Sequence, residues 1–175
     1  MRFFKLFIIL IFTGLLFGCV SPAQVDKMAA KETTTMIFSE NLHKNIKLNE
    51  VGSIGGYGIV KGSDFELALF KTLKNLDLIA LNNTPKYELS AQVMDIKEPL
   101  GGGSLTVTSK IKYLLIENST QKVLINKTIS SPYTAHFSDA LIGVTRLKLA
   151  NEGSVRINIM SFLKELSELQ LEPEM

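Results

Sequence analysis

Residues 87–130 read YELSAQVMDIKEPLGGGSLTVTSKIKYLLIENSTQKVLINKTIS, and this stretch decides the fold. Apolar and polar residues alternate within residues 87–93, 105–113 and 123–130, which is the period-two pattern of half-buried β-strands. The glycines and polar residues between these segments predict turns. Because strands with short connections pair in sequence, the stretch predicts an antiparallel meander with one apolar and one polar face.

An amphipathic helix is predicted before the meander. Ser63 and Glu66 have the spacing of a capping box, in which two side chains satisfy free amide groups at a helix start. Phe65, Leu69 and Leu73 then repeat at four-residue intervals and form one apolar stripe.

A longer amphipathic helix is predicted after the meander, with Ser138 or Asp139 as its N-cap. Its apolar stripe comprises Leu147, Ala150, Val155, Ile159, Phe162 and Leu166. Glu152 and Arg156 are spaced for an ion pair on the helix surface. Gly153 marks either a close-packing point or a break between two helices.

The order of predicted elements is β-α-β-β-β-α, because residues 46–51 alternate weakly and predict a first strand. This order indicates the α+β class, with a single domain, a mostly antiparallel sheet and both helices on the apolar face. The strand–helix–strand crossover makes the first two strands parallel. We expect this α/β domain to span residues 33–170, with a tail at residues 171–175.

The first 18 residues, MRFFKLFIILIFTGLLFG, have the features of a bacterial export signal. Arg2 and Lys5 form a positively charged start, and roughly a dozen apolar residues follow. A membrane-spanning helix needs about 20 apolar residues, so this run is too short for a permanent span. We therefore expect residues 1–18 to be a signal peptide.

Leu16-Phe17-Gly18-Cys19 resembles the bacterial lipobox, in which the cysteine thiol receives a diacylglycerol, the signal is removed before it, and fatty acids such as palmitate complete the anchor. Cys19 is the single cysteine, which excludes an intramolecular disulfide. Residues 19–32 are expected to form a lipidated tether. Val20 rather than Asp follows Cys19, and the resemblance implies the periplasmic face of the outer membrane. The alternatives are an ordinary signal peptide with an incidental cysteine, or an uncleaved anchor.

The composition argues against several classes of function. The chain has 19 Lys and Arg against 17 Asp and Glu, and removal of Arg2 and Lys5 with the signal leaves 17 against 17. Such a neutral domain is a poor candidate for binding nucleic acid, because phosphate neutralisation needs surplus cations. No metal-binding, P-loop or nucleophile motif occurs, so we expect no cofactor, no metal site and no catalytic residue.

Several short motifs carry a further resemblance. They are Gly55-Gly56, Tyr87-x-Leu89-x-Ala91, Pro99-x-Gly101, Arg146-Leu147-x-Leu149-Ala150-x-Glu152-Gly153 and Arg156-x-Asn158-Ile159. With the lipobox, they are similar to a group of uncharacterised proteobacterial lipoproteins, some of which are misnamed acyltransferases. The element order also resembles lipoproteins that assist lipopolysaccharide assembly and those that accompany lipid-transport ABC systems.

The resemblance implies a non-enzymatic accessory or interaction module in outer-membrane or lipid-transport assembly, held at the membrane through Cys19 and bound to an envelope protein. Fold likeness alone does not establish such a function. The alternatives are an acyltransferase or hydrolase, or a small-ligand or peptidoglycan-binding module.

The topology predicts where a contact site would lie. The two parallel strands and the last strand of the meander end on one side of the sheet, which brings glycine loops and aromatic residues together. The candidate contact residues are Tyr57, Gly102, Tyr133, His136 and Phe137. Aromatic anchors dominate interface energetics, which favours a contact with a partner. The alternative is that the glycines only permit tight turns and that Tyr133 and Phe137 pack under the last helix.

We predict that Cys19 carries lipid and that residues 1–18 are absent from the mature protein. Mass spectrometry of the membrane fraction should find a first peptide that begins at a modified Cys19. A Cys19→Ala protein should lose firm membrane attachment, because stable anchoring takes at least two acyl chains. An intact amino terminus, or a Cys19→Ala protein that stays fully membrane-bound, would contradict the prediction.

Overall fold

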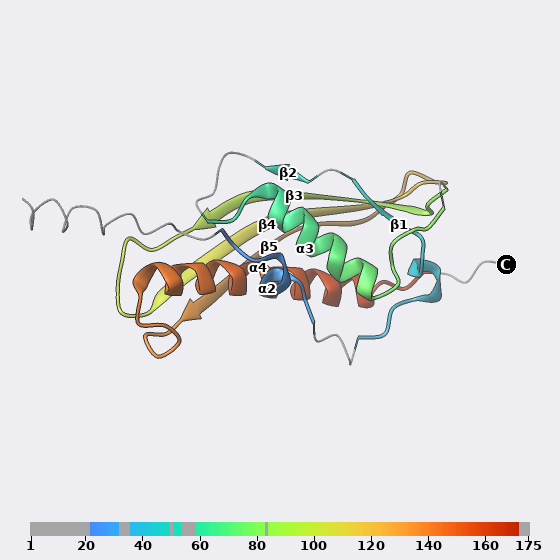
Figure 1. Cartoon of the computed structure of the whole chain (residues 1–175). Helices are drawn as coiled ribbons and strands as arrows, with labels where there is room; N and C mark the ends of the chain where they lie inside the picture. Colours follow the sequence, from blue (N-terminus) through green and yellow to red (C-terminus); the bar gives the residue numbers. More distant parts are fainter. Residues whose placement is uncertain (1–21, 32–35, 50, 54–58, 83, 172–175) are drawn as a thin grey trace, which may run out of the picture.

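Three long strands form the antiparallel meander that the sequence predicts (Figure 1). They are β3 (Tyr87–Lys97), β4 (Leu105–Glu117) and β5 (Val123–Ala135). The structure, a computed structural model, describes residues 22–31, 36–49, 51–53, 59–82 and 84–171.

Two short strands, β1 (Ile46–Leu48) and β2 (Gly52–Ser53), run parallel to β3 along its outer edge. A 3-10 turn, η1 (Glu40–Leu42), precedes β1. The sheet order is β1-β3-β4-β5, with β2 also beside β3. The parallel start and the antiparallel remainder of the sheet are therefore as predicted, but the first strand, predicted over residues 46–51, ends at Leu48 and a separate short strand follows.

The strands are longer than their alternating pattern indicates. β4 continues past Tyr113 to Glu117 through three consecutive apolar residues that hide the alternation. Pairing holds this part in the sheet, because Leu115 lies opposite Leu89 of β3 and Ile125 of β5. Backbone pairing with two neighbours thus decides where a strand ends, and side-chain alternation underestimates its length.

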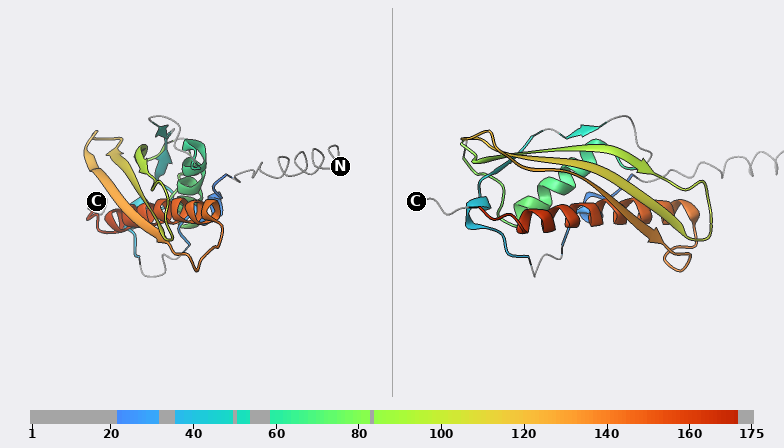
Figure 2. Two further views of the ribbon diagram at one scale, coloured as in Figure 1. Left: turned by 90° about the vertical axis from the view of Figure 1, so that its left-hand side faces the viewer. Right: turned by 180° about the vertical axis from the view of Figure 1, so that it is seen from behind.

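Both main helices cover one face of the sheet, as predicted, and leave the other face open (Figure 2). α3 (Gly62–Asn75) connects β2 to β3, and α4 (Gly143–Ser167) follows β5. Large core side chains between the two layers include Phe65, Leu69, Leu73, Leu89, Ile111, Tyr113, Leu115 and Phe162. The predicted α+β class is confirmed.

The start of α3 differs from the prediction by about one residue and by its capping group. The helix begins at Gly62, and the Asp64 carboxylate accepts a hydrogen bond from the Lys61 backbone amide at 3.3 Å. The predicted capping box of Ser63 and Glu66 is wrong. Several neighbouring residues could serve as a cap, so the sequence pattern alone does not fix the first residue of the helix.

Residues 22–31 pack against the helices rather than extending from the domain. They include a short helix, α2 (Val25–Met28), and its last residue is fully buried. The buried Ala30 amide donates to the Thr72 hydroxyl of α3 at 3.0 Å. Most of the predicted tether therefore belongs to the folded body. The buried residues of this segment are alanines and one Met, which do not recur at a helical or strand interval. The sequence pattern therefore does not reveal their burial.

α4 holds the other side of this segment. The buried Glu152 carboxylate accepts the Gln24 amide at 2.8 Å and lies 3.9 Å from the Lys148 ammonium. Arg156 donates to the Lys27 carbonyl at 3.1 Å. The predicted ion pair between Glu152 and Arg156 is wrong, because both side chains bind the N-terminal segment instead.

Buried polar side chains fasten α4 to the middle of the sheet. Asn158 donates to the backbone carbonyls of Ser109 at 3.1 Å and Ile129 at 3.0 Å. Its amide oxygen accepts the Tyr113 hydroxyl at 3.0 Å, and burial raises the pKa of Tyr113 well above its usual range, so this hydroxyl remains a donor. Ser154 accepts the Ser109 amide at 2.7 Å. Because unsatisfied buried polar groups are costly, these bonds fix the position of α4 along the strands.

Gly153 is a close-packing point within one continuous helix, so the helix does not break there. A Cβ at this position would overlap the ring of Tyr133 on β5. The Arg156 guanidinium lies over the same ring, 5.8 Å from its centroid. The absence of a side chain at Gly153 therefore lets the helix approach the sheet closely.

We predict that Gly153→Ala lowers the free energy of unfolding by about 1–3 kcal/mol, the usual effect of overpacking. Urea unfolding would measure this. Gly103→Ala is the matched control, since a Cβ there meets no atom within 4 Å. In a Tyr133→Leu background, the effect of Gly153→Ala should shrink, because the clashing ring is gone. A Gly153→Ala protein as stable as the wild type would disprove the close packing.

Candidate functional site

One end of the molecule gathers loops from distant parts of the chain. β3 and β5 end there, and β4 and α4 begin there (Figure 1). We define this end, the tip, as residues 98–104 and 136–145. No residue is charged from Pro99 to Leu105 or from Ala140 to Thr145. Glu98 and Asp139 are the charged residues of the tip, which therefore differs from the more highly charged surfaces elsewhere on the domain.

Arg146, in the first turn of α4, holds the two loops of the tip together. Its side chain is almost fully buried, with 6% exposed. One guanidinium nitrogen donates to the carbonyls of Ala140 at 2.6 Å and Leu141 at 2.9 Å. The other donates to the Gly102 carbonyl of the opposite loop at 3.4 Å. The guanidinium also lies over the Phe137 ring, 4.9 Å from its centroid, which is a cation–π contact.

No carboxylate among the described residues pairs with this guanidinium, and its Nε has no hydrogen-bond partner there. Backbone carbonyl dipoles and one aromatic face therefore carry the stabilisation of a buried cation. A buried charge is costly unless it is hydrogen-bonded. We infer that Arg146 fixes the shape of the tip, and we call this arrangement the Arg146 clamp.

Two further features shape the loop between β3 and β4. Asn151 of α4 donates to the Glu98 carboxylate at 2.8 Å, which ties the start of the loop to the helix. Gly102 has a φ of 138°, a conformation that favours glycine. Gly101 and Gly103 have open space around the position of a Cβ, so side chains can be introduced there.

A tight turn shapes the loop between β5 and α4. The Asp139 carboxylate accepts the His136 backbone amide at 2.7 Å. The predicted role of Ser138 or Asp139 as the N-cap of α4 is wrong, because the helix begins only at Gly143. Ile142 occupies the cap position without a side-chain bond. The capping carboxylate thus serves the turn, and apolar residues lead into the helix.

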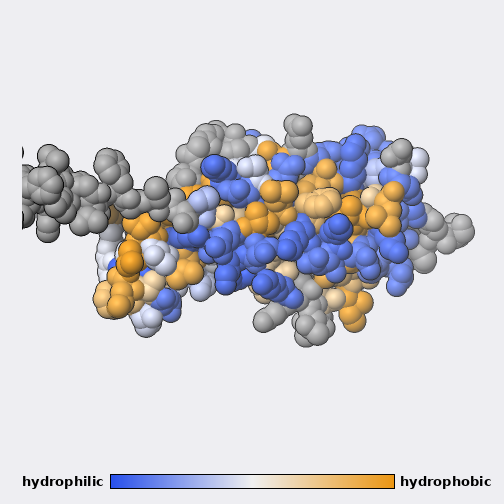
Figure 3. Space-filling view, in the orientation of Figure 1, coloured by the Kyte–Doolittle hydropathy of each residue, from blue (hydrophilic) through white to orange (hydrophobic). Residues whose placement is uncertain are grey.

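The tip exposes a group of large apolar side chains. They are Leu100, Phe137, Leu141, Ile142 and Val144, and Leu141 keeps 78% of its surface exposed. In Figure 3 apolar side chains gather at the lower left, where Figure 1 places the loop between β5 and α4. Scattered exposed apolar residues are common, but a contiguous group on loops with few charges indicates a contact surface.

A shallow hollow of about 330 Å³ lies between the two loops. Its lining residues are Pro99, Leu100, Gly101, Gly102, Leu105, Gly143, Val144 and Leu147. The lining is aliphatic or glycine and contains no aromatic ring. The hollow therefore offers little for stacking a sugar or another flat ligand.

The structure places four of the five predicted contact residues. Gly102 and Phe137 lie at the tip and both contact Arg146. His136 is exposed beside Phe137. Tyr133 is half-buried on β5 under Gly153, which is the packing role that the alternative assigned to it.

Cys19 and Tyr57 lie outside the described residues. Arg146, Leu141 and Ile142 were missed as site residues by sequence reasoning. The available signal for Leu141 and Ile142 was that apolar residues occupy a stretch next to a strand end, where Gly, Pro, Asn, Asp and Ser are usual in a connection.

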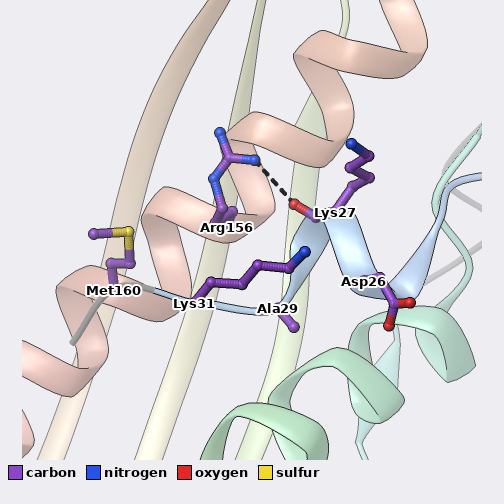
Figure 4. A pocket seen from close by; sticks show the side chains of 6 residues that line it. All are labelled: Asp26, Lys27, Ala29, Lys31, Arg156 and Met160. Atoms are coloured by element: carbon purple, nitrogen blue, oxygen red, sulfur yellow. Dashed lines mark hydrogen bonds between the residues drawn. The ribbon is translucent and has the colours of Figure 1, made fainter. Parts of the chain in front are cut away.

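A second hollow of about 330 Å³ lies beside α2 (Figure 4). Its lining residues are Asp26, Lys27, Ala29, Lys31, Arg156 and Met160. Four of these six lining residues are charged. Among the residues described, no His, Cys, Asp and Glu side chains cluster as a metal site, and no helix is long and apolar enough to cross a membrane.

No protein-family model and no curated protein sequence matches this chain. Its fold is similar to a Xanthomonas campestris protein of the family DUF330, with a TM-score of 0.60, 10% identity, and coverage of 82% of this chain and 90% of that one. The fold is also similar to the PelC dodecamer from Paraburkholderia phytofirmans, with a TM-score of 0.53, 15% identity, and coverage of 78% of this chain and 96% of that one. A minor lipoprotein from Acinetobacter baumannii has a TM-score of 0.48, 11% identity, and coverage of 71% of this chain and 93% of that one.

The first two similarities define the class of fold, and at such low identity they show the fold alone. The resemblance expected from the sequence is thus confirmed at the level of the fold, in the match to the DUF330 protein. None of the three proteins is named for a catalytic activity.

We predict that Arg146→Lys loosens the tip, because one ammonium cannot reproduce the fork that reaches both loops. The free energy of unfolding should fall by about 1–3 kcal/mol, the cost of unsatisfied buried groups. Limited proteolysis should show faster cleavage within residues 136–142. Arg156→Lys, on the same helix but bound to Lys27, should not change that cleavage. Equal cleavage in the two variants would rule out the Arg146 clamp.

Proposed function

We propose that this protein is a lipid-anchored, non-enzymatic protein of the cell envelope, and that it acts through its tip as an accessory or interaction module. The observation that carries the proposal is the Arg146 clamp. A buried cation holds two loops that carry few charges, so that large apolar side chains face outward. Such a patch is unfavourable in water unless it is covered in use, which supports a contact function.

The anchor and its location are part of the same proposal. Cys19 at the end of the lipobox supports lipid attachment on the periplasmic face of the envelope. Val20 in the next position supports the outer membrane rather than the inner one. The likeness in element order to auxiliary lipoproteins supports a role in outer-membrane or lipid-transport assembly, with an envelope protein as partner.

The placement of reactive side chains favours binding over acyl transfer or hydrolysis. His43 precedes β1 and His136 follows β5, so the two histidines lie at opposite ends of the sheet. Ser109 and Ser154 are buried and bonded to each other and to backbone groups. A nucleophile needs an adjacent base, and neither serine lies beside a histidine in the described structure. The aliphatic lining of the tip hollow likewise gives little support to a small-ligand or peptidoglycan-binding module.

Complementation of a deletion strain would test the proposal, with entry of large antibiotics and detergent as the measure of the outer-membrane barrier. We expect the deletion to weaken the barrier and the wild-type gene to restore it. Cys19→Ala and Leu141→Asp should fail to restore it, because the first removes the anchor and the second places a charge on the tip.

Two control variants make this test specific. Leu81→Asp should restore the barrier, since Leu81 is as exposed as Leu141, at 82% against 78%, but lies outside the tip. His43→Ala should also restore it, because no catalytic base is proposed and His43 lies at the end of the sheet opposite the tip. An intact barrier in the deletion strain would argue against an assembly role. Loss of function in a folded His43→Ala protein would favour the enzymatic alternative.

A further inference from the structure

We infer that the tip docks on the phospholipid bilayer that holds the anchor, with its apolar side chains at the boundary between headgroups and acyl chains. This inference rests on the proposed lipid attachment at Cys19. It goes further, because it identifies the partner of the tip as a lipid surface and gives the domain a fixed orientation on the membrane.

The length of chain before the folded body is the first argument. Ala23 is already bound to the fold, because its amide donates to the Ile59 carbonyl at 3.2 Å. Only three peptide links separate Cys19 from Pro22. Fully extended, they span at most about 11 Å. A lipid-anchored domain therefore cannot stand away from the membrane, and some part of its surface must lie against the headgroups.

The second argument is where the chain enters the fold. The Gln24 amide binds Glu152, nine residues after the first residue of α4, and nine helical residues span about 14 Å. From α2 back to Pro22, the chain runs toward the end of α4 that lies at the tip (Figure 1). The anchor point is thus on the tip half of the molecule. The opposite end of the sheet, where β3 begins, is separated from the tip by the full 11 residues of that strand.

The third argument is the distribution of charge near the anchor. The flank beside α2 carries the side chains of Lys27, Lys31 and Arg156 around the hollow of Figure 4. Charged side chains remain at headgroup level or in water. The tip carries Leu100, Leu141 and Ile142 on loops without charge over residues 99–105 and 140–145. Among the described residues near the anchor, the tip is therefore the surface best suited to enter the apolar part of the bilayer, with the exposed Asp139 at headgroup level.

The Arg146 clamp suits a lipid surface. Loop backbone in a bilayer is tolerated where its polar groups are satisfied, and Arg146 binds the carbonyls of Ala140, Leu141 and Gly102 from within the protein. Amphipathic surface elements enter roughly 5–10 Å at the interface, which suits the depth of a loop apex. The short tether also keeps the tip at high local concentration near the bilayer.

Docking by the tip would point β3 and β5 toward the membrane and leave the open, polar face of the sheet directed sideways into the periplasm. This face includes Gln92, Thr108 and Lys110. An envelope protein could then bind the sheet face while lipid covers the tip. The lipid contact and the contact with an envelope protein would then lie on different surfaces of one oriented domain.

The test uses the lipidated, mature chain in phosphatidylethanolamine–phosphatidylglycerol vesicles that contain a nitroxide-labelled phospholipid as quencher. Lipid occupies the thiol of Cys19, so an introduced cysteine is the single site for a fluorescent label. Leu141→Cys places the label on the tip, and Leu81→Cys is the matched control of equal exposure. We expect quenching at position 141 to exceed that at position 81 by about twofold or more, with a blue-shifted emission, as for interfacial insertion.

The possible outcomes separate the inference from the proposed function. Labelled protein that does not float with the vesicles would contradict the lipid anchor itself. Protein that floats but shows equal quenching at both positions would overturn tip docking and leave the anchor standing. A blue shift at position 141 without quenching would also overturn it, because protein rather than lipid would then cover the tip. Introducing Ile142→Asp into the Leu141→Cys protein should abolish the excess quenching, while unfolding in urea confirms that the variant folds.

Discussion

The buried contact between Asn158 and the backbone of β4 and β5 sets the position on which the other features depend. One amide side chain binds the carbonyls of Ser109 and Ile129 and the hydroxyl of Tyr113. Polar groups buried without partners are costly, so α4 has one favourable position along the sheet. Arg146 lies twelve residues earlier on the same helix, about 18 Å away, and this places it between the two loops of the tip.

The tip illustrates how a domain can keep apolar side chains exposed without losing its shape. An apolar loop in water tends to collapse onto the nearest core. Here the Arg146 guanidinium binds carbonyls of both loops and stacks on Phe137. These contacts fix the loop backbone from its protein side, while the side chains of Leu141 and Ile142 remain exposed to solvent. Stabilisation of the loop backbone is thus separated from burial of its side chains.

Local patterns predicted the meander, its faces and the two helix stripes, because alternation and four-residue repeats depend only on neighbours in the chain. They failed where a distant group competes. Asp139 was expected to cap α4 but binds the His136 amide, and Glu152 was expected to pair with Arg156 but binds Gln24. The N-terminal segment was expected to be a tether, yet its alanines fill the space between α3 and α4, which no periodicity reveals.

The sequence by itself determined the α+β class, the order of the main strands and helices, the apolar face of the sheet and the expectation of a lipid anchor at Cys19. Each of these depends on a pattern within one contiguous stretch of residues. The sequence also indicated the end of the sheet at which Gly102 and Phe137 lie. The tertiary structure decided that Tyr133 packs under Gly153 while Phe137 stays at the surface. It also revealed Arg146, whose partner Gly102 is 44 residues away. A periodic pattern cannot encode such a contact, because it forms only after the helix and both loops have been brought together by the sheet.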